Sequence, residues 1–168
     1  LSLLAEDPDK TLHELLQENL WMFGTHPAKS MPEAVKKGEL PVLIKFIDAA
    51  SDLSVQVHPD DAYAREHENG QLGKSEMWYV VDAAPGAKLV YGFSHDMDRE
   101  RVREAAQNGT LEKHLQRVPI RKDDVFFIPA GTVHAIGGGS LIAEVQESSN
   151  LTYRLYDYHR IGKDGKER

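Results

Sequence analysis

From Pro41 onward, short apolar runs alternate with clusters of turn residues, and this pattern is the strongest constraint on the fold. Runs of roughly four to eight residues rich in Val, Ile, Phe and Tyr, bounded by Gly, Pro, Asn or Asp, indicate β-strands. Many short strands joined by polar turns are typical of a sandwich or barrel, so we predict a mainly β domain. The expected strands are 42–47, 53–58, 77–81, 88–92, 125–128, 133–136, 140–146 and 152–158.

Helices are expected around this β pattern. Thr11 and Glu14 form a capping-box pair that predicts a helix over 11–22, with leucines 12, 15, 16 and 20 as its apolar stripe. A short helix is expected over 61–68. A longer one is expected over 98–116, with Val102, Ala105, Ala106 and Leu111 on its buried side. We therefore predict a helical segment 1–40 that packs on the barrel, a barrel 41–160 with a helical insert near 98–116, and a polar tail 161–168.

Composition excludes several classes of protein. A chain of 168 residues suits one domain, and it has no cysteine for disulfides or thiolate metal sites. The net charge of −7 argues against nucleic acid as a partner, but it leaves room for a small phosphorylated ligand. No apolar run approaches the roughly 20 residues of a membrane span, and the acidic start does not resemble a signal peptide. We expect a cytoplasmic protein. Because both ends look cut, we also expect a fragment that associates with a missing domain or with a second copy.

The segment 53–59 suggests the first half of a metal site. Side chains alternate faces along a strand, so Gln56 and His58 point to one side and Val55 and Val57 to the other. Residues two apart on one face lie about 7 Å from each other, close enough to converge on one ion.

Two later residues complete the predicted site. Glu76 opens an otherwise apolar strand, an unusual place for a carboxylate unless a cation partners it. His134 follows the turn formed by Pro129 and Gly131, and lies at the start of the next strand. Together with Gln56 and His58 these residues offer an amide oxygen, two imidazoles and a carboxylate. That set suits Zn²⁺, and also Fe²⁺, Mn²⁺, Co²⁺ or Ni²⁺.

Simpler interpretations exist for each residue alone. A single histidine in a strand is more often hydrogen-bonded than metal-bound, glutamine is a rare ligand, and Glu76 could pair with Lys74 alone. The other histidines take the structural interpretation: His13, His26, His67, His95, His114 and His159. The metal interpretation is favoured because Gln56, His58, Glu76 and His134 occur together.

These segments resemble a known family. The runs 53–61, 73–79 and 129–136 are similar, in this order, to type I mannose-6-phosphate isomerases, and the closing 153–158 is similar to their shorter bacterial members. Pro129 to His134 also resembles the second cupin motif. The resemblance implies a cupin-type β-barrel (jelly roll) with peripheral helices. It also implies a zinc-dependent isomerase that interconverts mannose 6-phosphate and fructose 6-phosphate.

The resemblance also implies roles for individual residues. It places the metal ligands on Gln56, His58, Glu76 and His134, and it makes Lys74 and Arg154 active-site residues. Asn150 stands where many members have Asp four residues before the arginine, so ring opening by that group is not expected here.

The residues themselves indicate how such a site could work. Lys74 lies two residues from Glu76, so it would share the face of the ligand and act as an acid–base group or phosphate contact. Arg154 and Tyr156 are expected on one face with Tyr158, where Arg154 could bind phosphate, stabilise an enediolate or form a salt bridge to Glu144 or Asp157. Glu144 is expected to line the pocket. Proton transfer through a cis-enediol is the expected chemistry, with substrate contacts from Lys74, Arg154, Glu144 and Tyr156.

Two other functions remain open at this point. A metal-dependent cupin oxygenase would favour Fe²⁺ and more histidine ligands, and Gln56 counts against it. A non-catalytic metal-binding or sugar-binding module would fit a shortened chain.

Overall fold

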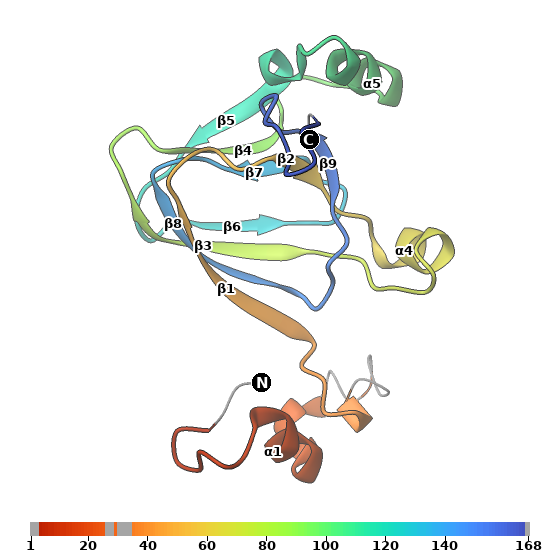
Figure 1. Ribbon diagram of the computed structural model, residues 1–168, viewed down its shortest axis with the longest axis vertical. Coiled ribbons are helices and arrows are strands. Elements are labelled where there is room, and N and C mark those ends of the chain that lie inside the picture. Colours follow the sequence, from red (N-terminus) through yellow and green to blue (C-terminus); the bar gives the residue numbers. More distant parts are fainter. Residues whose placement is uncertain (1–3, 26–28, 30–34, 167–168) are drawn as a thin grey trace. The chain divides into compact units, whose positions relative to one another are not determined.

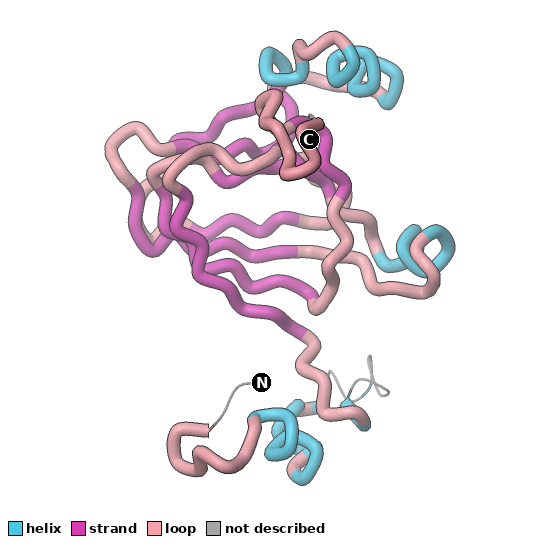
Figure 2. Tube along the Cα trace, in the orientation of Figure 1, coloured by secondary structure: helices cyan, strands magenta, loops and turns pink. Residues whose placement is uncertain are grey.

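The computed structural model describes residues 4–25, 29 and 35–166, and it divides the chain into two compact units, 1–43 and 44–168. Each unit is described by itself. Figure 1 gives the order of the elements along the chain, and Figure 2 separates helices from strands by colour. Among the described residues, no helix combines the length and the hydrophobicity that crossing a membrane requires.

The first unit contains the helix α1 (Leu12–Glu18) and the 3₁₀ helix η1 (Leu20–Phe23). Thr11 and Glu14 form the predicted capping box. The predicted single helix over 11–22 is wrong in its second half, because Asn19 leaves the helical conformation at φ −130° and the chain continues as a tighter 3₁₀ turn. This change turns Leu20 outward, while Leu16, Phe23 and Val35 form a small apolar cluster.

The second unit is built from two facing sheets. Their strands are β1 (Val42–Ala49), β2 (Val55–Val57), β3 (Glu76–Ala83), β4 (Lys88–Phe93), β5 (Leu115–Pro119), β6 (Val125–Ile128), β7 (His134–Ile136), β8 (Ser140–Glu147) and β9 (Tyr153–Tyr156). The four-stranded sheet has the order β1-β8-β3-β6, and the five-stranded sheet has the order β5-β4-β7-β2-β9. Two short helices lie in the connections between strands: α4 (Asp61–His67) and α5 (Arg99–Gln107).

The core lies between the two sheets. Trp78, Val80 and Ile142 from the four-stranded sheet pack with Leu89 and Ile136 from the five-stranded sheet. These side chains alternate with outward-facing ones along each strand, as the period of two requires. A second cluster packs α5 against the outer side of the five-stranded sheet through Ala105, Val90 and Val55.

Two predicted elements end earlier than expected. The helix predicted over 98–116 is α5 followed by the 3₁₀ helix η2 (Leu111–His114), and β5 begins at Leu115 and was not predicted. The reason is Gly109, whose φ of +66° ends the helix directly after Asn108. The predicted strand 152–158 stops at Tyr156, because Tyr158 and His159 take positive φ values of 56°. The packing of 1–40 on the barrel and the separate polar tail 161–168 stay predictions.

Candidate metal centre

The register of the five-stranded sheet brings three predicted site residues side by side. Gln56 on β2 pairs with His134 on β7 and, across its other edge, with Arg154 on β9. Directly paired residues on neighbouring strands point to the same face of a sheet. This pairing therefore agrees with the prediction from the sequence that the side chains of Gln56 and His134 belong to one site.

The turn before β7 determines where this strand begins, and His134 is its first residue. The amide of Thr132 donates to the carbonyl of Pro129 at 3.1 Å, and Gly131 has a φ of +85°, which a side chain would disfavour. The amide of Gly131 also donates to the carbonyl of His58 at 2.8 Å. This bond holds the turn beside the end of β2, and so holds His58 and His134 near each other.

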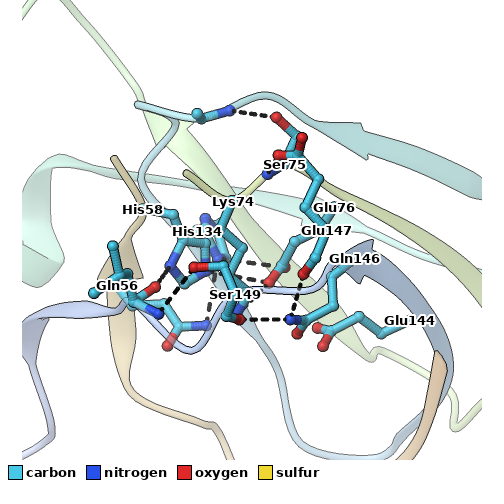
Figure 3. Close-up of polar contacts among 12 residues, drawn as sticks. Gln56, His58, Lys74, Ser75, Glu76, His134, Glu144, Gln146, Glu147 and Ser149 are labelled. Atoms are coloured by element: carbon cyan, nitrogen blue, oxygen red, sulfur yellow. Dashed lines mark hydrogen bonds and ion pairs between the residues drawn. The ribbon is translucent and has the colours of Figure 1, made fainter. Parts of the chain in front are cut away.

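Glu76 approaches these residues from the opposite sheet. It is the first residue of β3, and its side chain is buried. The Nε2 atoms of His58 and His134 lie 3.2 Å and 3.6 Å from its two carboxylate oxygens. Ligand atoms of the three side chains all lie within 4.8 Å of one another (Figure 3).

Both imidazoles are held with the same nitrogen facing Glu76. His58 donates from Nδ1 to the carbonyl of Leu151 at 2.8 Å, and His134 donates from Nδ1 to the carbonyl of Thr132 at 2.8 Å. A hydrogen bond donated by one ring nitrogen fixes the tautomer, and it leaves the lone pair of the second nitrogen available for a metal. Within the described part of the chain, Nε2 of His58 and Oε1 of Glu76 are buried without a hydrogen bond of normal geometry, and the ammonium of Lys74 contacts Oε1 as an ion pair. The unsatisfied Nε2 beside a carboxylate fits a bound dication.

Gln56 adds a fourth side chain. Its amide nitrogen lies 3.3 Å from Nε2 of His134. Rotating the amide by half a turn exchanges its nitrogen and oxygen, so the same position can present an oxygen ligand. The resulting set of one amide oxygen, two imidazoles and one carboxylate matches ligands that Zn²⁺ and its neighbours accept.

The charges of the centre are set by burial and by close contacts. Burial alone would raise the pKa of Glu76, but its contacts with His58 and Lys74 lower that pKa to about 2. Burial lowers the pKa of His134 to about 4. At neutral pH the centre therefore offers an ionised carboxylate and a neutral His134 imidazole, the protonation states that metal binding requires.

Lys74 belongs to the same cluster. Its ammonium is buried and lies 2.9 Å from Oε1 of Glu76, so the ion pair considered from the sequence forms, but beside the two imidazoles and not alone. The preceding Gly73 makes this possible, because a Cβ there would lie 2.4 Å from the backbone of Asp60. The amide of Lys74 also donates to the carbonyl of Pro59 at 3.0 Å, which ties the lysine to the end of β2.

A second buried carboxylate lies beside the centre. Glu144 on β8 pairs with Trp78, whose indole N–H lies 3.0 Å from Oε2 of both Glu76 and Glu144. Lys45 on β1 lies 2.9 Å from Oε1 of Glu144 and also donates to Gln146. Lys45 was not predicted as a site residue. The signal was available, since it is a lone cation between apolar residues of β1.

Two residues of the predicted substrate site, Arg154 and Tyr156, do not lie together. Arg154 is exposed on the face shared with Gln56, and it has no ion-pair partner among the described residues. The salt bridges considered from the sequence do not form, because Glu144 pairs with Lys45 and Asp157 with Arg160. The predicted shared face of Arg154 and Tyr156 is wrong.

A bulge in β9 explains the position of Tyr156. The register shifts by one residue, so Val55 faces Tyr156 while Gln56 faces Arg154. Tyr156 therefore packs against the apolar cluster around Val55, and its hydroxyl donates to Glu112 at 3.4 Å. It lies away from the metal centre.

Comparisons with known proteins agree with this geometry. Residues 3–79 match the family model described as phosphomannose isomerase type I, catalytic domain. The chain is 42% identical over 158 residues to the mannose-6-phosphate isomerase ManA of Bacillus subtilis, covering 94% of this chain and 47% of the relative. It is 43% identical over 157 residues to the mannose-6-phosphate isomerase of Streptococcus mutans, covering 94% of this chain and 46% of the relative.

The fold has a solved counterpart. The crystal structure of a mannose 6-phosphate isomerase from Bacillus subtilis superposes with a TM-score of 0.79 at 38% identity, covering 95% of this chain and 48% of that one. The prediction of a mainly β, cupin-type fold with a few helices is thereby confirmed. The chain spans about half the length of the relatives it matches. On these grounds the chain is similar, over nearly its whole length, to the type I phosphomannose isomerases.

Proposed function

We propose that this chain forms the metal-bearing part of an aldose–ketose isomerase that interconverts mannose 6-phosphate and fructose 6-phosphate. One observation carries the proposal: two buried imidazoles, each oriented by a backbone carbonyl, present Nε2 to the same buried carboxylate. The names of the relatives supply the substrate class. We further propose Zn²⁺ as the ion, a cytoplasmic location, and Gln56, His58, Glu76 and His134 as the ligands.

The reaction moves a proton between C1 and C2 through a cis-enediol. When bound, the ion would polarise the sugar oxygens and stabilise the negative charge that develops on them. The side chains of the chain then have to hold the substrate and handle the proton.

Lys74 is the proposed acid–base residue. Its ammonium contacts Glu76 at 2.9 Å and is screened from solvent, so a proton it holds or moves is not exchanged freely with bulk water. The close approach at Gly73 fixes its position relative to the ligands.

Arg154 is proposed to bind the substrate. It lies on the face of Gln56 and has no protein partner in the described part of the chain, so its guanidinium is available for a phosphate or an enediolate oxygen. Glu144 is buried and already accepts hydrogen bonds from Trp78 and Lys45, so we assign it a positioning role beside Glu76. Tyr156 is not included, because it faces the other cluster.

A coupled assay that detects fructose 6-phosphate formed from mannose 6-phosphate tests this function. Arg154→Ala should keep the metal content and lose turnover by about 100-fold to 1000-fold, the usual effect of removing one charge-stabilising donor. Arg103→Ala, an exposed arginine on α5, is the matched control and should leave the rate unchanged.

The other outcomes separate the alternatives. An unchanged rate in Arg154→Ala would remove this residue from the site. Oxygen uptake with Fe²⁺ in place of isomerisation would favour the oxygenase. Retained metal with neither activity would identify a binding module.

A further inference from the structure

His95 and His114, which are not among the residues of the metal centre, form a second cluster of potential ligands. His95 follows β4, and His114 is the last residue of η2. Their rings face each other with centroids 5.1 Å apart, and Nδ1 of His114 lies 3.1 Å from Nε2 of His95. Two imidazole nitrogens bound to one Zn²⁺ at about 2.0–2.1 Å lie roughly 2.9–3.4 Å from each other. The observed separation already falls within that range.

Ser94 orients one ring of this pair. Its hydroxyl lies 3.1 Å from Nδ1 of His95 and donates to the carbonyl of His114, also at 3.1 Å. The hydroxyl therefore accepts from Nδ1–H of His95, which leaves Nε2 of that ring to accept from Nδ1–H of His114. An ion bound by the pair would replace the proton that lies between these two nitrogens, while the bond from Nδ1 to Ser94 would still orient the ring of His95, as hydrogen bonds orient other metal-binding imidazoles.

The backbone keeps the two histidines together. The amide of Ser94 donates to the carbonyl of His114 at 2.8 Å, and Phe93 pairs with Leu115 at the end of the β4–β5 ladder. The pair is thus fixed by strand pairing and does not depend on the side-chain contact alone. For both nitrogens to bind one ion, Nδ1 of His114 must give up its proton, while the backbone positions can stay as they are.

Space for an ion and further ligands is available beside the pair. A cavity of about 390 Å³ is lined by His95 and His114 together with Glu104, Arg101 and Thr110. Glu104 contributes a negative charge to this cavity, while Arg101 is paired with Asp98 at 3.6 Å. Water can fill the remaining coordination positions, as in metal sites with an open side.

We infer that His95 and His114 form a second, peripheral site for a divalent transition-metal ion that favours imidazole, such as Zn²⁺, Cu²⁺ or Ni²⁺. With only two protein ligands this site binds more weakly than the buried centre. An ion held there links the end of β4 to η2. This inference does not depend on the isomerase activity.

Metal stoichiometry tests the inference. After removal of metal with a chelator, the chain is dialysed against buffered Zn²⁺ and its metal content is measured. The unaltered chain should take up two equivalents, and His95→Gln/His114→Gln should take up one. His67→Gln, which removes an exposed histidine of α4, is the matched control and should keep two.

The remaining variants separate the two sites. The equivalent that the double variant retains shows that it is folded, and Glu76→Ala should lose that equivalent and keep the weaker one. Ser94→Ala should weaken the second site by about 10-fold to 100-fold, because the ring of His95 is no longer oriented. Uptake of one equivalent by the unaltered chain, or of two by the double variant, would overturn the inference.

Discussion

The interior of the barrel has two halves that lie on the same strands and differ sharply in chemistry. Along β3 the inward side chains run from Glu76 through Trp78 to Val80, and along β8 from Gln146 through Glu144 to Ile142. Glu76 is as buried as Val80, with 1% and 0% of its surface exposed. The two halves are therefore equally buried. We call the part with Glu76, Glu144 and Gln146 the polar half, and the part with Val80 and Ile142 the apolar half.

The difference shows what each half contributes. Apolar side chains such as Ile142 gain free energy when they leave water. Buried charges such as Glu76 and Lys74 lose hydration, and removing one partner of such a pair is strongly destabilising. The buried charges of the polar half thus lower the stability of the fold, and the burial of the apolar half offsets this loss. Four experiments test this division.

The largest effect is expected from Glu76→Ala. It removes the carboxylate that both imidazoles face, so the affinity of the buried centre for Zn²⁺ should fall by at least about 1000-fold, or roughly 4 kcal/mol. Equilibrium dialysis with metal analysis measures this loss. Glu66→Ala, an exposed position on α4, is the control, and full metal content in Glu76→Ala would show that the polar half needs no Glu76.

The opposite half is tested by Ile142→Ala. This side chain is fully buried between the sheets, so its truncation should lower the free energy of unfolding by about 2–5 kcal/mol. Metal affinity should be unchanged in the folded protein. Denaturant unfolding and dialysis measure the two quantities, and a parallel loss of metal would mean that the halves are not independent.

Of the two halves, only the polar one should lose stability when the pH is lowered. In the metal-free protein the pKa of His134 is lowered to about 4 from 6.5, so the unfolded chain binds this proton at higher pH than the folded one. Stability should therefore fall as the pH drops from about 6.5 to about 4, by up to roughly 3 kcal/mol. The lowered pKa of Glu76 extends the loss toward pH 2.

Unfolding curves across this pH range check the prediction. His134→Gln should flatten the dependence above pH 4, whereas Ile142→Ala should lower stability by a similar amount at every pH. An equally steep curve in His134→Gln would assign the acid sensitivity to another group.

The smallest effect is expected at the boundary between the halves, in Trp78→Phe. The ring still fills the core, but the N–H that lies 3.0 Å from both Glu76 and Glu144 is lost. Stability should fall by about 1–3 kcal/mol, and metal affinity by about 10-fold. Calorimetry with and without Zn²⁺ separates the two losses, and a change in stability alone would make Trp78 a packing residue.

Much of the fold could be predicted because it depends on local patterns. Short β-rich runs bounded by turn residues identified eight of the strands, and the Thr11 capping box identified the start of α1. The short β5 could not be predicted, since 115–119 carries no clear alternation and follows a helical pattern directly. Lys45 stands out in the sequence as a lone cation in β1, but its role could not be predicted because its partner, Glu144, lies 99 residues further along the chain.

The sequence by itself determined which residue types are available for the proposed site: two candidate ligands on and directly after β2, an isolated carboxylate at the start of β3, and a turn that begins β7 at His134. These depend on strand alternation and turn chemistry, which act over a few residues. Only the tertiary structure decided which side chains converge. The facing sheets brought Glu76 to His58, the bulge in β9 turned Tyr156 away from Arg154, and strand pairing placed His95 beside His114. Register and sheet packing are long-range properties, because they follow from the joint burial of segments that are distant in sequence.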